Sequence, residues 1–284
     1  MSRPGLTAVR REVVADDRRG FRALFSGRDL EASGAGNVSM LVGGGQPVAN
    51  RARLLSALGL GLDDAVFMRQ VHGAAVAVVG RGDAGRGARD HGEAVADVDA
   101  LVTGAERTAL VALTADCVPV VLAAAGRAVG VVHAGRRGIV AGVVANAVAA
   151  LRREAGCEGG HEAVREAGPS AGAGPAVSAL IGPAIGPCCY EVPSALAEQV
   201  RAAVGGPDAR TRAHAPALDL PRTVERQLAA AGVDDVTTVS ACTACGPGAW
   251  FSHRAAPGSG RQLTAVVRAV PPPSDRRVFL DWSA

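Results

Sequence analysis

The sequence predicts an α+β fold built on mixed β-sheets, and three observations support this class. Strand-like runs of Val, Leu and Ala follow one another in hairpin-like order over residues 98–133. Amphipathic helical patterns occur singly among the strands instead of alternating regularly with them. Hydrophobic residues make up 48% of the 284 residues, enough to bury a sizeable core. We find no internal repeat and no clean domain boundary, so we expect residues 1–284 to form a single domain.

The first half of the chain is predicted to contain one helix followed by strands. A helical period places the helix at 47–58. Two short strands, at 66–72 and 74–79, flank a His-Gly turn. Apolar runs then predict strands at 98–103, 108–114, 118–123 and 128–133.

The second half is predicted to contain more helix. An apolar stripe predicts a helix at 139–154, with Gly156 suited to end it. The elements expected after it are a strand at 177–182, helices at 194–204 and 220–231, and strands at 235–240 and 262–269. Residues 1–18 are polar, and residues 156–177 are rich in Gly, Ala, Ser and Pro. We therefore expect both segments to be loosely ordered.

The basic residues exclude several classes of chemistry. All 30 are arginine, and the chain has no lysine. This rules out a Walker-A phosphate loop, a pyridoxal Schiff base and any other lysine nucleophile. The net charge of +3 is nearly balanced, and no arginine cluster is interleaved with aromatic residues. We therefore expect no nucleic-acid partner.

The sequence also bears on compartment. The first 20 residues carry no apolar run after their basic residues, which argues against a secretory signal. No apolar stretch reaches the roughly 20 residues that a membrane span needs. We expect a cytoplasmic protein with no membrane partner, in which cysteines are thiols or ligands rather than disulfides.

One pair of chemistry-bearing residues is predicted to meet across a hairpin. Two strand-like runs flank the segment AAAGR within 110–138. Pairing centred on residue 125 places Cys117 opposite His133, and such partners have Cβ atoms about 4.5–5.5 Å apart. The pair could be a buried thiol beside a core histidine, a nucleophile with its base, or two metal ligands. His72, beside Gly73 in RQVHG, is the candidate third ligand.

Several motifs carry a resemblance to a known family. RQVHG, DVDALVT, LVALTADCVP, VVHAGRRG, IGPAIGPCCYEV and WFSHR occur in this order. The chain resembles the YfiH family over about residues 20–269. This family is also called the laccase-domain or polyphenol oxidase family, and its members are now regarded as purine nucleoside phosphorylases. The resemblance implies an α/β/β/α layered sandwich, similar to cysteine hydrolases of the cytotoxic necrotizing factor type. It also implies metal ligands at His72, Cys117 and His133.

The resemblance implies an activity and bears on the metal. Family members act by phosphorolysis of adenosine, inosine, guanosine and methylthioadenosine, and they also deaminate adenosine. Two histidines and a cysteine with one open position are typical of catalytic zinc, although copper also fits this ligand set. A true multicopper laccase needs on the order of eight further histidines, whereas the chain has six in all, which excludes that class.

Phosphate must be held by arginine or by backbone N–H groups, because lysine is absent. Arg51, in an ANR segment, and Arg137, in the GRRG turn before the 139–154 helix, are the candidates. The ordinary alternative for each arginine is a solvated surface charge. Tyr190, the sole tyrosine, either lines the purine pocket or packs under a loop. Asp116 is either an acid–base group or a turn residue, and Asp99 is a weaker candidate of the same kind.

Some positions depart from the family pattern. Arg136 replaces a tryptophan, His253 a tyrosine and Ala255 an arginine. We expect Cys188 and Cys189, and the Cys242–Cys245 pair of the CTAC segment, to be ordinary thiols, because one C-x-x-C pair is weak evidence for a metal or redox site without a second pair. We expect a purine nucleoside and phosphate as partners of a monomer or homodimer. The alternatives are a cysteine hydrolase that edits cell-wall precursors and an inactive metal- or partner-binding protein.

Overall fold

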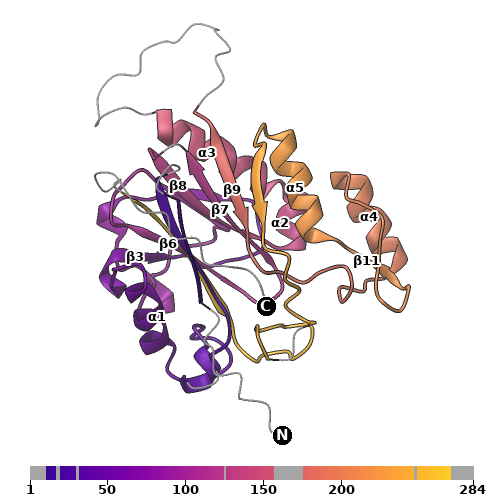
Figure 1. Cartoon of the computed structure of the whole chain (residues 1–284), viewed down its shortest axis with the longest axis horizontal. Coiled ribbons are helices and arrows are strands. Elements are labelled where there is room, and N and C mark those ends of the chain that lie inside the picture. The colour runs from indigo at the N-terminus through magenta and orange to yellow at the C-terminus, as the bar shows by residue number, and fades with distance from the viewer. Residues whose placement is uncertain are drawn as a thin grey trace, which may run out of the picture.

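Two β-sheets packed face to face, with helices on both outer faces, make up the fold (Figure 1). The computed structural model describes residues 11–16, 20–29, 32–124, 126–156, 175–245 and 248–269. The α+β class and the α/β/β/α layering predicted above are confirmed. Within the described ranges, no helix is long and apolar enough to cross a membrane.

The first sheet has five strands in the order β1-β2-β13-β6-β3. These strands are β1 Arg11–Asp16, β2 Phe21–Ser26, β13 Gln262–Arg268, β6 Ala109–Thr114 and β3 Ala65–Phe67. Its pairs are antiparallel except for β3 with β6, which is parallel. The strand β13 comes from the end of the described chain, so the sheet joins both halves of the sequence.

The second sheet has six strands in the order β12-β9-β7-β8-β5-β4. These strands are β12 Asp235–Thr238, β9 Val177–Ile181, β7 Val118–Ala124, β8 Ala128–Ala134, β5 Ala100–Thr103 and β4 Val76–Val78. The outermost pair on each side is parallel, and the inner pairs are antiparallel. A separate two-stranded ribbon pairs β10 Ala209–Arg210 with β11 Pro216–Ala217.

The core has three layers, because each sheet buries both of its faces. The middle layer consists of apolar side chains from the facing sheets, including Phe25, Val121 and Val266. The helix α1 Pro47–Ser56 covers the outer face of the first sheet through Leu54 and Leu55. The helices on the second sheet are α2 Arg136–Ala141, α3 Val143–Gly156, α4 Ser194–Val204 and α5 Leu220–Ala230. Short 3-10 helices lie at Ser33–Gly36, Leu62–Asp64, Arg81–Asp83 and His91–Glu93.

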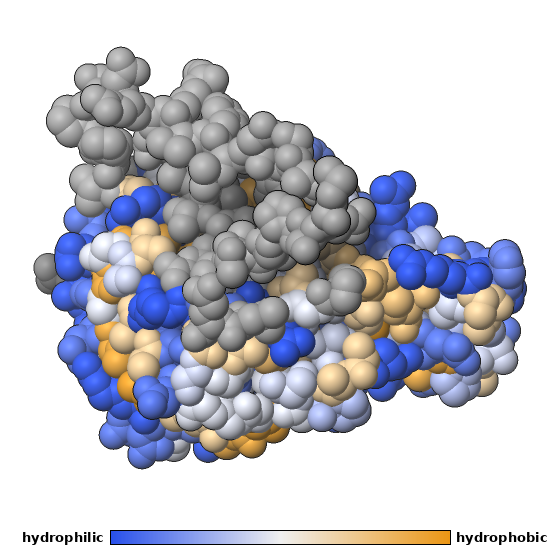
Figure 2. Space-filling model, turned by 60° about the horizontal axis from the view of Figure 1, so that its bottom comes forward, coloured by the Kyte–Doolittle hydropathy of each residue, from blue (hydrophilic) through white to orange (hydrophobic). Residues whose placement is uncertain are grey.

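The surface mixes residue types. On the face in Figure 2, hydrophobic residues form small groups among hydrophilic ones, including on the lobe at the right, where Figure 1 places α4. The large apolar side chains that are exposed in the described ranges are Leu41, Val71, Val78 and Val140. Isolated exposed apolar residues of this kind are normal on a protein surface.

The structure corrects three of the predictions above. Residues 1–18 were expected to be loosely ordered, yet Arg11–Asp16 forms the strand β1. This strand pairs with β2, and neither of the two strands was predicted. The runs at 66–72 and 74–79 are not neighbours, because β3 and β4 belong to different sheets. The helix expected at 139–154 is two helices, because Gly142 adopts a left-handed φ of 89° and ends α2 before α3 begins. Most of the 156–177 segment lies outside the described residues.

Candidate metal and substrate site

Two of the predicted ligands lie where the chain passes from one sheet to the other. His72 lies between β3 of the first sheet and β4 of the second. Cys117 lies between β6 of the first sheet and β7 of the second. His133 is the penultimate residue of β8, which neighbours β7. The three side chains therefore meet at one end of the sandwich.

The three side chains are close enough to share one ion. Cys117 Sγ lies 3.7 Å from His72 Nε2. The imidazole rings of His72 and His133 meet edge to face, with centroids 4.8 Å apart and an interplanar angle of 80°. One ligand atom from each residue lies within 4.8 Å of the other two. The expected convergence is therefore present in the geometry.

The hairpin register that led to this expectation was wrong. Pro119, not Cys117, lies opposite His133, and Ala124 pairs with Ala128. The hairpin is thus centred on residue 126, with Gly126 in the expected left-handed conformation at φ 72°. Cys117 precedes the first pair and still reaches the site, because it lies beside Gly135 at the open end of the hairpin.

Gly135 makes the close approach possible. A Cβ atom at this position would lie 2.6 Å from Cδ2 of His72 and 3.1 Å from Sγ of Cys117. Real Cβ atoms essentially never lie within 3.0 Å of another heavy atom, so any side chain here would displace the His72 ring. The glycine of the HAG motif is therefore required by the spacing of the site.

Asp99, a weaker candidate in the sequence analysis, is hydrogen-bonded to two of the candidate ligands. Its fully buried carboxylate accepts hydrogen bonds from the backbone N–H groups of Val71, His72 and Gly73 at 3.2, 2.9 and 2.6 Å. These bonds hold His72 at a positive φ of 60°, which is unusual outside glycine. The same carboxylate lies 2.7 Å from Nδ1 of His133, which leaves Nε2 of that ring for a ligand.

The site favours a charged thiolate–imidazolium pair. Burial alone would raise the pKa of Cys117, but the adjacent His133 and His72 outweigh it and lower the pKa to about 6. Burial alone would lower the pKa of His133, but Cys117 and Asp99 outweigh it and raise the pKa to about 9. A thiolate is the form of cysteine that binds metals and acts as a nucleophile.

Asp116 lies at the site, and both oxygens of its carboxylate accept hydrogen bonds from other residues. Its oxygens accept hydrogen bonds from Thr243 Oγ1 and from the backbone N–H of Arg254, both at 2.7 Å. Its own carbonyl accepts from the N–H of Ile185 at 2.9 Å. Asp116 also adopts a positive φ of 91°, next to Cys117. These contacts match the turn-forming alternative, because they fix the backbone that presents Cys117.

A cavity of about 570 Å³ opens onto the three candidate ligands. This volume lies within the range typical of small-molecule sites. Of the predicted substrate residues, Tyr190 and Arg137 line the cavity. The guanidinium of Arg254 stacks over the Tyr190 ring at 4.9 Å from its centroid.

The expectation for Arg51 is wrong. Its side chain is buried and does not line the cavity. Its Nε donates to the carbonyl of Val38 at 2.7 Å, and Nη1 donates to the carbonyls of Gly87 and Ala88 at 2.8 and 3.0 Å. The guanidinium also lies over the Phe67 ring. Arg51 therefore holds loops together, and its donors are not directed at a substrate.

Three arginines that the sequence did not select line the cavity, namely Arg136, Arg254 and Arg261. Arg136 had been noted only as a departure from a family tryptophan. Burial lowers the pKa of Arg261, and the charges of Cys117 and Asp116 act in the opposite direction. Motif membership could have selected them, because Arg136 lies in VVHAGRRG, Arg254 lies in WFSHR and Arg261 follows shortly after WFSHR.

Comparisons with known proteins identify the family of this chain. The profile of the family described as "Multi-copper polyphenol oxidoreductase laccase" matches residues 37–269. The chain belongs to this family. It is 38% identical over 219 residues to a protein of Mycobacterium tuberculosis named purine nucleoside phosphorylase, covering 77% of this chain and 78% of the relative.

Solved structures show the same fold. The crystal structure of YlmD from Geobacillus stearothermophilus matches with a TM-score of 0.74 and 30% identity, over 90% of this chain and 94% of that one. The crystal structure of a Bacillus licheniformis protein titled YfiH matches with a TM-score of 0.75 and 25% identity, over 93% and 98% of the two chains. The resemblance to the YfiH family stated above is therefore confirmed.

The word "multi-copper" in the family description does not fit the ligands of this chain. Among the described residues, two groups of at least three close Cys, His, Asp or Glu side chains are present, and only one of them contains histidine. A blue-copper centre plus a trinuclear cluster would need more histidines than the six in the sequence. The His72–Cys117–His133 group is instead suited to a single ion. Its 3.7 Å sulfur–nitrogen separation agrees with two ligands at about 2.3 and 2.1 Å from zinc.

Proposed function

We propose that this chain is a metal-dependent purine nucleoside phosphorylase whose reaction takes place in the cavity above His72, Cys117 and His133. The observation that supports it best is the combination, in one cavity, of this ligand group with four arginines. The names of the relatives point to the same activity. The proposed substrates are adenosine, inosine, guanosine and methylthioadenosine, each together with phosphate.

The cavity suits a nucleoside in size and lining. It has room for a purine ring and a ribose, since pockets for ligands of this size measure about 300–1,000 Å³. The Tyr190 ring gives it an aromatic wall, and Met68 and Leu113 add apolar surface. A planar purine is favoured by this kind of surface.

Phosphate is assigned to the arginines. In phosphorolysis a phosphate oxygen forms a bond to C1′ of the ribose while the bond between C1′ and the purine nitrogen breaks, and its electrons leave with the base. Arg136, Arg137 and Arg261 line the cavity and present guanidinium groups that can bind phosphate in a bidentate manner. Holding phosphate and ribose together makes a bimolecular reaction effectively unimolecular.

The metal site is assigned to His72, Cys117 and His133. A metal bound there supplies Lewis acidity, which stabilises charge that develops on the reacting nucleoside. The chain contributes a thiolate at Cys117 and a histidine oriented by Asp99. We propose zinc, with copper as the other ion that this ligand set accepts. Deamination of adenosine is proposed at the same site.

A phosphate-dependence assay tests the proposal. Purified protein loaded with zinc is expected to release adenine and ribose 1-phosphate from adenosine only when phosphate is present, and to form inosine without phosphate. Cys117→Ala should abolish both reactions, and Arg136→Ala should raise the KM for phosphate about tenfold. Protein that binds zinc but consumes no adenosine, with or without phosphate, would refute the proposal.

A second candidate is a cysteine hydrolase, and one observation favours it. Cys117, His133 and Asp99 follow the order of nucleophile, base and orienting carboxylate. This enzyme would work without metal. Activity that survives a chelator and is lost on alkylation of Cys117 would favour the hydrolase over the phosphorylase.

A further inference from the structure

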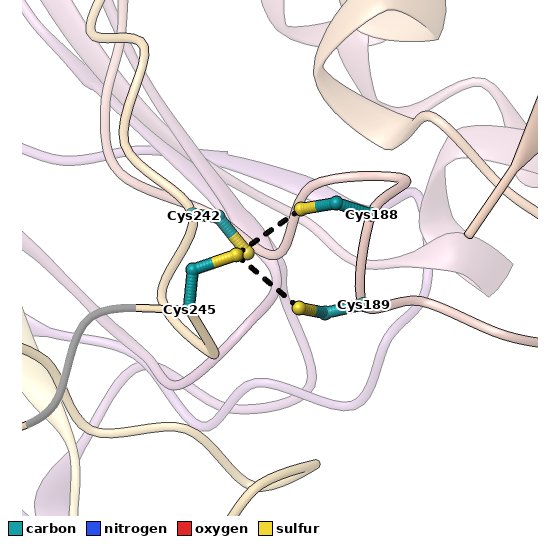
Figure 3. Close-up of side chains that lie close together, drawn as sticks. All are labelled: Cys188, Cys189, Cys242 and Cys245. Atoms are coloured by element: carbon teal, nitrogen blue, oxygen red, sulfur yellow. Dashed lines mark hydrogen bonds between the residues drawn. The ribbon is translucent and has the colours of Figure 1, made fainter. Parts of the chain in front are cut away.

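Four cysteines gather at a second place in the molecule. Cys188 and Cys189 lie in the loop after β9, and Cys242 and Cys245 lie in the loop after β12 (Figure 3). The sulfur of Cys245 lies 3.2 Å from that of Cys188 and 3.3 Å from that of Cys189. All four sulfur atoms lie within 4.8 Å of one another, and each residue is half-buried. The four side chains point toward a common centre.

The backbone around the cluster is built to hold the two loops together. Ala184 and the Cys242 segment form a parallel bridge, with bonds from Ala184 N to Ala241 O at 3.2 Å and from Thr243 N to Ala184 O at 3.0 Å. Within the C-x-x-C segment, Cys245 N donates to Cys242 O at 3.3 Å, which closes a turn. The approach of the four sulfur atoms therefore follows from a defined pairing of two loops.

Two further donors are directed at the sulfur atoms. The backbone N–H of Gly186 donates to Cys242 Sγ at 3.2 Å. The guanidinium of Arg212 donates to Cys245 Sγ at 3.1 Å. Bonds of this kind stabilise thiolate sulfur, because they place positive charge beside it. The cluster thus has one neutral donor at Cys242 and one charged donor at Cys245 that can stabilise thiolate ligands.

The dimensions match a tetrahedral ion. Zinc binds cysteine sulfur at about 2.3 Å, so the sulfur atoms of a tetrahedral site lie about 3.8 Å from one another. The separations here, from 3.2 Å to at most 4.8 Å, bracket that value. A C-x-x-C pair is weak evidence alone, but it becomes specific when a second cysteine pair faces it.

We propose that Cys188, Cys189, Cys242 and Cys245 form a structural zinc site, separate from the His72–Cys117–His133 group. With four protein ligands no position remains open for a substrate, which is the arrangement of structural zinc. Four thiolates and one Zn²⁺ leave two negative charges, of which Arg212 offsets one. The expectation that these cysteines are ordinary thiols is replaced by this proposal.

The proposed zinc braces one wall of the substrate cavity. Thr243, between the two cysteines of the C-x-x-C pair, donates to Asp116, the residue that precedes Cys117. Tyr190, which follows Cys189, lines the cavity and bonds through its N–H to Gly186 O at 3.1 Å. Loss of the ion is therefore expected to loosen Asp116 and Tyr190.

Metal content and coordination test the proposal in the full chain, purified under reducing conditions with zinc. Wild type is expected to hold two zinc ions. A His72→Ala/Cys117→Ala variant should keep one, and X-ray absorption at its zinc edge should show four sulfur neighbours at about 2.3 Å. Cys242→Ser/Cys245→Ser should lose one ion. Cys157→Ser, whose cysteine lies outside the described residues, is the matched control and should keep both.

A second measurement uses only wild-type protein, so it does not depend on whether a variant folds. Peptide mass spectrometry after brief alkylation should show the four cysteines reacting at least about tenfold more slowly with zinc than after chelation. The proposal is overturned if the His72→Ala/Cys117→Ala variant holds no zinc or shows nitrogen or oxygen neighbours. Equal alkylation in both states, or an intact mass two hydrogens lower owing to a disulfide, also overturns it. None of these results depends on phosphorolysis.

Discussion

Replacing Asp99 by asparagine tests the central geometric claim about the site. The carboxylate is fully buried and accepts bonds from three backbone N–H groups and from His133. Burial raises its pKa, but the bonds to His133 and Gly73 outweigh this effect, and the net pKa is below the usual value. The Asp99 carboxylate is therefore an ionised acceptor with two oxygens. Asparagine has the same shape but carries no charge, and one of its two terminal groups is a donor.

The loss of stability in Asp99→Asn follows from counting the hydrogen bonds that asparagine cannot accept. If the asparagine oxygen faces His72 N–H and His133, its NH2 group faces the N–H groups of Val71 and Gly73, and both of those bonds are lost. If the amide is reversed, the bond from His72 N–H is lost. His133 must then accept at Nδ1, which moves its proton to Nε2, where the metal is proposed to bind. Bonds to a charged group contribute about 1.5–3 kcal/mol each, so losing two lowers the free energy of unfolding by about 3–6 kcal/mol.

The assay is urea unfolding in the presence of a chelator, followed by zinc competition on the folded protein. Asp99→Asn should unfold at a lower urea midpoint with an unchanged slope, and its zinc affinity should fall about 10–100-fold. Asp97→Asn is the matched control. Its side chain is 65% exposed and pairs with Arg69, which is 45% exposed. An exposed ion pair of this kind contributes about 0–1 kcal/mol to the free energy of unfolding. Equal midpoints and zinc affinities for the two variants would refute the proposed role of Asp99.

Three further predictions follow from the same contacts. In metal-free protein the titrations of Cys117 and His133 should have opposing effects on stability. The contribution of Cys117, whose pKa is lowered from 9.0 to about 6, is complete above pH 9 and is lost as pH falls to 6, whereas that of His133, whose pKa is raised from 6.5 to about 9, is complete below pH 6.5 and is lost as pH rises to 9. The two slopes cancel, so the urea midpoint of wild type should change little between about pH 6.5 and 9, and a steep rise or fall across this range would contradict the paired titration. Arg51→Met should lower the free energy of unfolding by about 3–5 kcal/mol, measured in urea, because it leaves three carbonyl acceptors without their donor. The KM for phosphate of this variant should stay unchanged, whereas a raised KM would restore Arg51 as a phosphate ligand. Gly135→Ala should weaken zinc binding by more than about tenfold, because its methyl group would overlap the His72 ring. Unaltered zinc affinity would show that the backbone around Gly135 can shift to make room for the methyl group.

Local patterns predicted most of the regular elements. The helices α4 and α5 were predicted nearly to the residue, because each shows a helical apolar stripe bounded by Pro or Gly. The strand β1 was missed, because its sequence is rich in charged residues and it is held by pairing to β2. The division between α2 and α3 depends on the backbone conformation of one glycine, Gly142, which a periodicity analysis does not detect.

The residues that the structure brings together in the candidate site were predicted in part. His72, Cys117 and His133 could be selected because motif order and residue chemistry agree. Asp99 was undervalued, since its role depends on three N–H groups more than 25 residues earlier in the chain. Arg51 was misassigned, because its acceptors at Gly87 and Ala88 are 36 and 37 residues away in sequence. The four-cysteine cluster was missed for the same reason, as its two loops are brought together only by the pairing near Ala184.

The position of the site between the two sheets has a mechanical consequence. His133 is fixed in β8 of the second sheet, whereas His72 and Cys117 lie where the chain has just left the first. The apolar layer between the sheets has no directional bonds of its own, so it resists sliding less than the hydrogen-bonded ladders within each sheet do. An ion that holds all three side chains would lock one end of that layer against shear. Under a stretching force that pulls β13 away from β7, the metal-loaded protein should therefore rupture at a higher force than the metal-free protein.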